Sequence, residues 1–286
     1  MKQSRIQPGP SAFLVLLLIA TLLGACDEEQ VVPPPPETVN ASGIVWEMPL
    51  QTPLAGATVQ LITNEFTLTD PNYVRPCDCQ GDLCLARTTS LDCSPDNPNC
   101  PEKGRWEMDV PVKYDEKWAP FNMLIKVSKG TGPPQYNLFQ PGGTNQGDLQ
   151  ILNPVFFFLF ALDALAGGAD LGDLSVMFGV AIGFIDPAYP QKIAMMPGVK
   201  VMALGGDPAE QFPITYLGEA GLPDPELTET SSMGVFYFTV PDANEDAAPS
   251  IKVSGEKPGS VFVSSYFPAC PGSCSSAAVI DPYFKP

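Results

Sequence analysis

Residues 104–111 (GRWEMDVP) and residues 234–241 (GVFYFTVP) show how this chain of 286 residues is organised. In the first stretch the apolar residues Trp106, Met108 and Val110 occupy every second position, and charged residues stand between them. This period of two is typical of a β-strand that turns one face to a core and the other to water. Both stretches are therefore expected to form half-buried strands.

The two stretches belong to an internal repeat of four blocks that recur in the same order. In each copy a glycine, Gly104 or Gly234, precedes the strand, where it suits a turn with positive φ. The 33 prolines and 25 glycines supply many further turns and oppose a helical bundle. We therefore expect a mainly β fold with two tandem antiparallel β-sandwich domains. The blocks are residues 43–46, 55–61, 104–111 and 125–128 in the first copy, and residues 179–183, 197–201, 234–241 and 251–254 in the second.

A short apolar segment, residues 153–175, separates the two copies. Asn153 suits a helix N-cap, Pro154 the first turn and Gly167 the exit, so that a helix is predicted here. The run is apolar on nearly every side, which means that the body of the protein buries it or that it dips into a membrane. Because a spanning helix needs about 20 residues and Asp163 is costly in lipid, we expect a helix packed against the two sandwiches.

The first 25 residues have the layout of an export signal. Lys2 and Arg5 precede an apolar run over residues 12–23, which is shorter than the roughly 20 residues that cross a bilayer. The run ends in residues 23–26 (LGAC), which resemble the bacterial lipoprotein signal. That resemblance implies cleavage after residue 25 and attachment of lipid to Cys26.

Residues 26–38 then form an acylated, proline-rich tether, because Pro33 to Pro36 favour an extended polyproline conformation. Two or more acyl chains give a stable anchor. We therefore expect a protein of the bacterial cell envelope, with a membrane as partner through the lipid and the body outside the cytoplasm. Asp27 resembles the residue that retains such proteins in the inner membrane of enteric bacteria, so the choice of membrane stays open, with the outer membrane favoured.

The charge of the chain excludes one class of partner. Without residues 1–25 the chain keeps 13 basic and 32 acidic residues, a net charge of −19. Proteins bind nucleic acid through basic side chains that displace counterions from phosphates, and an acidic body repels those phosphates. Nucleic acid is therefore not expected as a partner.

Eight cysteines in an exported chain indicate disulfides, because the compartment outside the inner membrane is oxidising. Without the lipidated cysteine an odd number remains, so that at least one is free, pairs between chains or binds a ligand. A thiolate metal site at Cys77, Cys79 and Cys84 is an alternative, but zinc motifs usually show C-x2-C pairs and frequently histidine. We expect a disulfide-stapled loop without metal there, and a local disulfide between Cys270 and Cys274. The seven candidates are Cys77, Cys79, Cys84, Cys93, Cys100, Cys270 and Cys274.

The chain has no histidine, which excludes histidine-based triads and histidine-ligated zinc. Glu107 and Asp109 are expected to project outward as solvated charges rather than to act as an acid–base pair. Ser254 and Lys257 match S-x-x-K without a K-T-G or S-D-N companion, and we interpret the match as coincidence. Residues 242–246 begin like a calcium loop but lack its glycine and closing glutamate, so a polar turn is preferred. We expect no enzyme activity, cofactor or metal.

The order of the motifs, G-x-V, then P/A-G-x-x-V, then T-T/S-S, then G-x-F/W-x-x-x-V-P, resembles the carboxypeptidase regulatory-like domain, a small prealbumin-type β-sandwich. The resemblance covers residues 39–130 and 176–266, and a cysteine-rich insertion at 77–103 departs from the pattern. It implies a noncatalytic accessory module of transport, adhesion and cell-surface proteins. The expected parts are a signal peptide at 1–25, a tether at 26–38, sandwich 1 at 39–152, a helical connector at 153–175 and sandwich 2 at 176–286.

These observations predict a noncatalytic, lipid-anchored envelope protein with a structural or interaction role, whose partner is another envelope protein or a saccharide. One alternative is a saccharide- or peptide-binding surface lipoprotein, in which Trp46, Trp106, Trp118 or the cysteine loop lines a pocket. A carboxylate-based hydrolase is a further alternative. An aromatic row on an exposed face favours the first alternative, and a concave site with two unpaired carboxylates favours the second.

Overall fold

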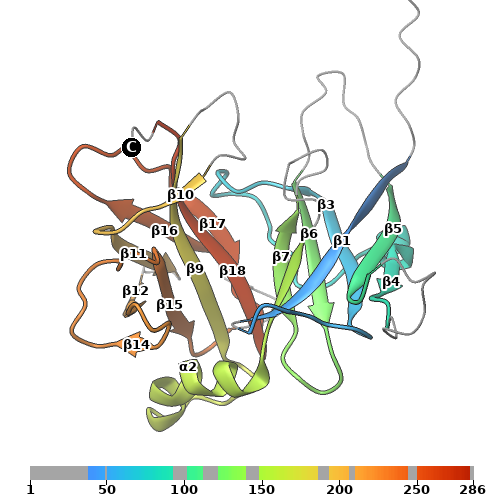
Figure 1. Ribbon diagram of the computed structural model, residues 1–286, viewed down its shortest axis with the longest axis horizontal. Helices are drawn as coiled ribbons and strands as arrows, with labels where there is room; N and C mark the ends of the chain where they lie inside the picture. Colours follow the sequence, from blue (N-terminus) through green and yellow to red (C-terminus); the bar gives the residue numbers. More distant parts are fainter. Residues whose placement is uncertain are drawn as a thin grey trace, which may run out of the picture. The chain divides into compact units, whose positions relative to one another are not determined.

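Both copies of the repeat form β-strands in the computed structural model (Figure 1), which confirms the prediction of a mainly β protein. We call residues 38–152 the first half and residues 175–283 the second half. The predicted signal peptide, the tether up to residue 37, Cys93, Cys100 and Trp118 lie outside the described residues. The structure describes residues 38–48, 50–92, 102–111, 122–139, 148–185, 193–205, 210–243 and 250–283.

Two facing sheets form the first half. Its elements are β1 (Thr38–Met48), β2 (Thr52–Pro53), β3 (Thr58–Phe66), the 3-10 helix η1 (Gly81–Leu85), β4 (Arg87–Thr89), β5 (Arg105–Pro111), β6 (Asn122–Ser128), β7 (Gln135–Phe139) and β8 (Leu149–Leu152). In one sheet β1 pairs with β2, β5 and β8, and the other contains β4, β3, β6 and β7 in that order. The apolar faces of both sheets meet in a core around Trp106, Val45 and Val59, which are buried.

The second half repeats this arrangement. Its strands are β9 (Ser175–Phe184), β10 (Ile193–Met195), β11 (Lys200–Gly205), β12 (Glu210–Phe212), β13 (Thr215–Leu217), β14 (Pro223–Asp224), β15 (Val235–Val240), β16 (Ser250–Glu256), β17 (Ser265–Pro268) and β18 (Ser273–Asp281). Strand β9 pairs antiparallel with β10 and β15 and parallel with β18, as β1 pairs with β2, β5 and β8. The core lies around Phe236, Phe238 and Val253, which are buried between this sheet and the sheet of β12, β11, β16 and β17.

Matching backbone hydrogen bonds relate the two halves. The carbonyl of Gly104 accepts from the amide of Val45 at 2.9 Å, and the carbonyl of Gly234 accepts from the amide of Ala181 at 2.7 Å. Both glycines have a positive φ, +78° and +65°. A Cβ on Gly234 would lie 2.9 Å from the Ala181 oxygen, so only glycine fits this turn without strain. The alignment of Gly104 with Gly234 is therefore confirmed.

A buried hydroxyl completes an equivalent turn in each half. Thr230 Oγ1 accepts from the amide of Val199 at 3.0 Å and donates to the carbonyl of Met196 at 2.7 Å. Ser90 makes the same pair of bonds in the first half, at 2.9 and 2.8 Å. Thr230 is 3% exposed and Ser90 2%. Each hydroxyl therefore satisfies two backbone groups that water does not reach.

Replacement of Thr230 by valine is expected to lower the free energy of unfolding by about 1–3 kcal/mol, because the buried amide and carbonyl lose their partner while the side-chain volume hardly changes. Urea unfolding followed by circular dichroism measures the loss. Thr228→Val is the matched control, because Thr228 is exposed two residues away. Equal stability of the two variants would show that the buried hydroxyl contributes nothing.

One block of the repeat is aligned incorrectly by sequence. The sequence blocks match Ser128 with Ser254 and Thr58 with Lys200. In the structure, Thr58 pairs with Ser128 on the neighbouring strand. Lys200 pairs with Glu256 instead of Ser254. The structural match of Ser128 is therefore Glu256, two residues beyond the predicted one. A shift of two residues leaves every side chain on its own face, so the alternating pattern does not detect it.

The two halves share one sheet. Strand β7 of the first half runs parallel to β18 of the second, with Gln135 opposite Cys274 and Tyr136 opposite Ser275. Within the described residues this joins ten strands, along the path β14-β13-β15-β9-β18-β7-β6-β3-β4, with β10 also paired to β9. Residues 37–286 form one compact unit. The predicted division into separate domains at residues 152 and 176 stays a prediction.

Two buried amide side chains of β7 bond the backbone of β8, whose one paired neighbour within the described residues is β1. Gln135 Oε1 accepts from the amide of Leu152 at 2.5 Å, and its Nε2 donates to Ser276 Oγ at 3.1 Å. Asn137 bonds both the amide and the carbonyl of Gln150, at 3.0 and 2.8 Å. These side chains bond backbone groups of β8, as a neighbouring strand would, and Gln135 also bonds Ser276 of β18.

The predicted helix is present as α2 (Pro154–Ala166), and the Asn153 side chain accepts from the amide of Val155 as its N-cap. Its inner face packs on the second half, where Phe160 stacks on Tyr237 with ring centroids 4.5 Å apart. The expectation that the body covers the helix on every side is wrong, because Leu162 is 54% exposed. The helix contacts β9 and β15 through one face, which leaves its other face open to solvent. No helix among the described residues is both long and apolar enough to cross a bilayer.

Candidate functional site

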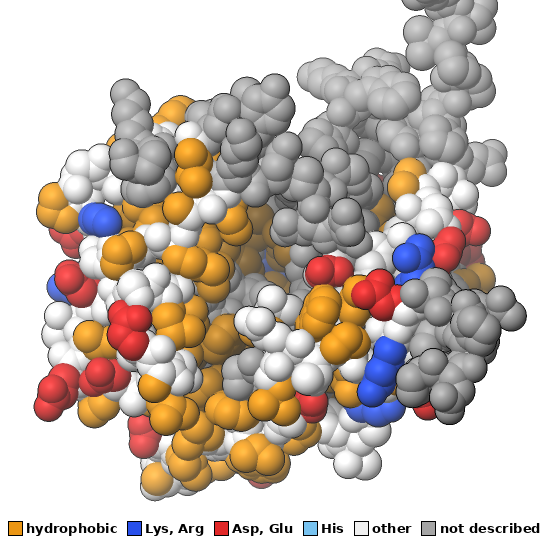
Figure 2. Space-filling model, in the orientation of Figure 1, with side chains coloured by type: hydrophobic (Ala, Val, Ile, Leu, Met, Phe, Trp, Pro, Cys, Tyr) orange, Lys and Arg blue, Asp and Glu red, His pale blue; other side chains and the backbone are white. Residues whose placement is uncertain are grey.

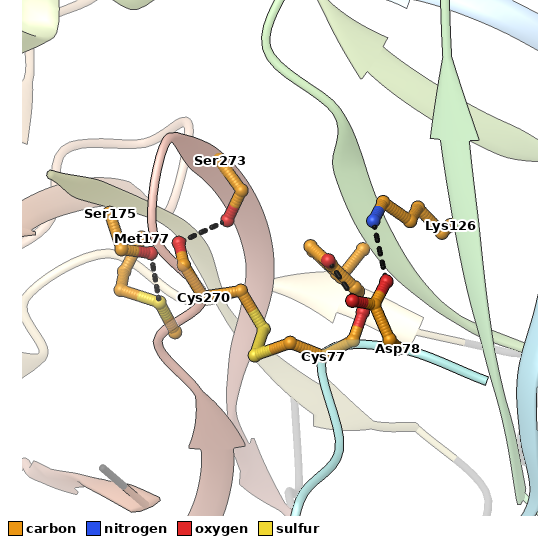
Figure 3. Close-up of a disulfide and its surroundings, with 8 residues drawn as sticks. Cys77, Asp78, Lys126, Ser175, Met177, Cys270 and Ser273 are labelled. Carbon is orange, nitrogen blue, oxygen red and sulfur yellow. Dashed lines mark hydrogen bonds and ion pairs between the residues drawn. A yellow bond between two sulfur atoms is a disulfide. The ribbon is translucent and has the colours of Figure 1, made fainter. Parts of the chain in front are cut away.

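A disulfide joins the two halves beside the shared sheet. Cys77 lies in the loop after β3, and Cys270 lies just before β18, 193 residues later (Figure 3). Cys77 is 8% exposed and Cys270 1%. We call Arg75, Cys77, Tyr136, Tyr266 and Cys270 the clasp: the disulfide and the Arg75–Tyr266 bond connect this loop of the first half to the second half, and Tyr136 bonds Cys77 within the first half.

Arg75 is a buried cation, 2% exposed, whose guanidinium is surrounded by backbone oxygens. Its Nε donates to the carbonyl of Tyr266 at 2.7 Å, and this is one of the hydrogen bonds between the halves. Its Nη1 donates to the Tyr73 carbonyl at 2.7 Å, and Nη2 donates to the carbonyls of Thr67 and Asp70 at 2.8 Å each. The guanidinium also lies 5.1 Å from the centre of the Tyr266 ring, within cation–π range. Burial lowers the pKa of Arg75, which stays protonated because its ordinary pKa is far above neutrality.

Tyr136 connects the clasp to the sheet. Its hydroxyl donates to the carbonyl of Cys77 at 2.8 Å, and Lys126 Nζ lies 5.5 Å from the centre of its ring. Lys126 also forms an ion pair with Asp78 at 3.0 Å (Figure 3). Burial opposes the charge of Lys126, but Tyr136 and Asp78 outweigh it and raise the pKa of this amine. The loop is thus held at neighbouring residues by covalent, polar and ionic contacts.

The prediction of a disulfide-stapled loop is confirmed for the part of the cysteine cluster that the structure describes. Cys79 pairs with Cys84 five residues later, within η1, and Gln60 Nε2 donates to Cys79 Sγ at 3.0 Å. Cys77, Cys79 and Cys84 are therefore all oxidised, and none is a thiolate that could bind a metal ion. Among the described residues no group of His, Cys, Asp or Glu has the arrangement of a metal site.

The predicted Cys270–Cys274 disulfide is wrong. Cys274 has a free, buried thiol that packs against α2, whereas Cys270 lies with Cys77 and Tyr136. Tyr136 faces Ser275, so adjacent Cys274 points to the opposite side of the sheet from the clasp. Burial raises the pKa of Cys274 to about 12, which keeps the thiol protonated and unreactive. The sequence predicted that at least one cysteine is free, pairs between chains or binds a ligand, without indicating which one; Cys274 is free.

The other candidate residues do not converge on a reactive site. Glu107 and Asp109 are exposed, as predicted, and Asn40 Nδ2 donates to both, at 3.1 and 3.3 Å. Lys257 Nζ donates to the carbonyl of Pro197 at 2.7 Å, and Lys129 makes the equivalent bond in the first half. Lys257 is therefore part of the repeated framework rather than the partner of a nucleophile.

The tryptophans and the calcium-like turn are placed only in part. Trp106 is 1% exposed in the first core and cannot line a binding pocket, whereas Trp46 is partly buried on β1. Trp118 lies outside the described residues. In the calcium-like turn Asp242 is exposed, and residues 244–246 lie outside the described residues.

Sequence reasoning missed Arg75 and the connection that it makes. The signal available was weak, a single cation two residues before a cysteine. Tyr266, which supplies both the accepting carbonyl and the ring, lies 191 residues away. Only the fold brings these groups together.

No protein-family model and no curated protein matches the chain. Among solved structures, the chain is similar to the shaft pilin SpaA of Lactobacillus rhamnosus GG, at 12% identity over 87% of this chain and 100% of the pilin chain, with a TM-score of 0.25. A point variant of the same pilin matches at 11% identity, over 88% of this chain and 100% of that chain, with the same TM-score. Scores of this size do not establish a shared fold or function.

Proposed function

We propose that this protein is a noncatalytic, lipid-anchored component of a bacterial cell envelope, with a structural or interaction role. In this proposal the tether holds a stiff body above the membrane, and the body presents its far surface to a partner. The resemblance of both halves to carboxypeptidase regulatory-like domains supports a role without catalysis.

The observation that carries the proposal is the joint between the halves. Tandem domains connected by a single linker usually move relative to one another. Here β7 pairs with β18, the clasp adds the Cys77–Cys270 disulfide, and Arg75 donates to Tyr266. Hinge motion between the halves would disrupt the β7–β18 pairing and the Arg75 bond and is restrained by the covalent disulfide, so the body is suited to act as a rigid spacer.

The proposed anchor is supported by the sequence that precedes the body. Lys2, Arg5, the apolar run and the LGAC motif end at Cys26, and β1 begins at Thr38. The segment between them is short and contains four consecutive prolines. An extended polyproline segment rises about 3.1 Å per residue, which suits a short, stiff spacer.

The anchor is tested by Cys26→Ser in the full chain. The unchanged protein is expected to fractionate with membranes and to incorporate labelled palmitate, and the variant is expected to lose the label because serine offers no thiol for the lipid. Cys274→Ser is the matched control, because Cys274 is buried and should not affect labelling. Palmitate incorporation that survives Cys26→Ser would refute the anchoring proposal.

A further inference from the structure

The outer face of α2 carries apolar side chains exposed to solvent. Val155, Phe158 and Leu162 are 72%, 46% and 54% exposed, and we call these three residues the α2 stripe. Figure 2 shows hydrophobic side chains gathered along the lower edge of the molecule, where Figure 1 places α2. Their exposed area is on the order of 300 Å², the size at which a patch on a soluble protein is often functional.

A cavity of about 500 Å³ lies beside the α2 stripe. Its walls include Pro154 and Phe158 of α2, Pro133 and Pro134 of the turn between β6 and β7, and Leu171 after the helix. Phe158 belongs to both the cavity and the stripe. Apolar cavities of a few hundred Å³ accept one large side chain, which is the usual anchor of a protein interface.

The charged residues of α2 and of the loop after it are all acidic. The helix and the loop after it contain Asp163, Asp170 and Asp173, which are exposed, and no lysine or arginine. The C-terminal end of α2 adds the negative end of a helix dipole. Lys129, near the cavity turn, directs its amine to the carbonyl of Ala55. This end of the body therefore attracts cations.

We propose that the α2 stripe and its cavity bind a basic, amphipathic segment of another envelope protein. One apolar side chain of that segment fills the cavity, and its lysines or arginines lie against Asp163 and Asp170. A stable interface buries about 800 Å² per partner, so that a patch of this size supports weak, reversible binding. Charge complementarity raises the association rate and excludes acidic partners.

A membrane fits this face less well. Helices that lie in a bilayer surface carry lysine and arginine on their polar side, and α2 has neither. The position of the helix also opposes membrane contact if the protein is anchored at Cys26 as proposed. The body begins at Thr38, and α2 packs at the other end of β1, where Met48 accepts from the amide of Asn153 at 2.9 Å. Eleven strand residues separate these ends by roughly 33 Å.

A second copy of the chain also fits poorly. Two copies that paired through the α2 stripe would bring Asp163 and Asp170 of each close to the same groups of the other. Like charges in contact oppose association, and the paired apolar area of about 600 Å² falls below that of stable dimers.

The probe is a fluorescent synthetic peptide of leucines and lysines with one tryptophan, titrated with the full mature chain carrying Cys26→Ser to keep it in solution. Fluorescence anisotropy at about 50 mM NaCl is expected to show a Kd of about 10–100 μM, weakened several-fold at about 500 mM. Phe158→Glu and Leu162→Glu should each weaken binding about tenfold, and Asp163→Asn with Asp170→Asn about threefold. Leu222→Glu is the matched control, because Leu222 is 51% exposed at a different place and should leave Kd unchanged.

Three results would overturn the proposal. The first is peptide binding that both Phe158→Glu and Leu162→Glu leave unchanged while circular dichroism shows the native fold. The second is equal binding of a peptide in which glutamate replaces lysine. The third is flotation with lipid vesicles, or dimer formation in sedimentation, that Leu162→Glu abolishes, because the occupant would then be a membrane or a second copy. None of these measurements depends on palmitate labelling, so failure here is distinguishable from failure of the proposed anchor.

Discussion

Replacement of both Cys77 and Cys270 by serine is expected to lower the free energy of unfolding by about 5 kcal/mol, the largest effect that we predict for any pair of side chains. A cross-link stabilises a protein mainly by restricting its unfolded chain, and the restriction grows with the length of the closed loop. This bond spans 193 residues. The double variant also prevents Cys274 from pairing with a newly freed neighbour. Guanidinium unfolding monitored by tryptophan fluorescence measures the loss.

Cys79→Ser with Cys84→Ser provides the matched control for the same chemistry. This disulfide closes a separation of only five residues, so the chain-entropy argument predicts a loss of about 2 kcal/mol. Equal losses in the two double variants would contradict the argument, because the long loop would then contribute nothing beyond local packing.

Arg75→Met is expected to cost about 3–4 kcal/mol of stability. Methionine has a similar apolar length but leaves four partly buried carbonyl oxygens without the donors that the guanidinium supplies. Each bond from a charged donor contributes about 1.5–3 kcal/mol, and removal of the buried charge itself recovers part of the total. The loss is measured by the same unfolding titration.

Arg75→Lys separates the effect of the charge from that of its geometry. Lysine keeps the positive charge but has one nitrogen, so it cannot reach the carbonyl of Tyr266 and those of the loop together. We expect a loss of about 2 kcal/mol. A lysine variant as stable as the unchanged protein would show that a cation at this position is sufficient and that the arrangement of donors is unimportant.

These two predictions concern the joint on which the proposed spacer role depends. If the disulfide and the Arg75 bond of the clasp are removed by these substitutions and the shared sheet persists, the rate of amide hydrogen exchange is expected to rise in β7 and β18 before it rises in the two cores.

The α2 stripe lies on the second half, away from the start of β1, so a stiff joint keeps it at the end of the body where a partner can reach it.

The repeat illustrates what alternation and turn residues reveal. Turn glycines and apolar residues at every second position can be recognised in the sequence. The match of Gly104 with Gly234 is confirmed by equivalent hydrogen bonds. The match of Ser128 with Ser254 is wrong by two residues, because the pattern repeats every two residues and does not specify register. Strand pairing, a contact between distant segments, sets that register.

For the helix and the cysteines too, the sequence predicted the local features and the tertiary structure decided the rest. Asn153 and Pro154 predicted where α2 begins, since capping is local. How much of α2 is buried depends on the width of the surface beneath it, which local sequence does not encode. The number of cysteines in an exported chain predicted disulfides, but the short spacing of Cys270 and Cys274 predicted the wrong pair, because sequence alone does not determine connectivity.

The amino-acid order alone was sufficient for the β class, the helix boundaries and the outward direction of Glu107 and Asp109, since each depends on neighbours within a few residues. It was also sufficient for the duplication, which is visible by comparing the two copies, and for the presence of disulfides, which follows from the number of cysteines in an exported chain. The joining of both halves into one sheet, the partners of Arg75 and Cys77, and the exposed face of α2 became visible only in the folded chain. The β7–β18 pairing, the bond from Arg75 to Tyr266 and the Cys77–Cys270 disulfide each join groups more than a hundred residues apart, and long-range packing rather than local preference brings such groups into contact.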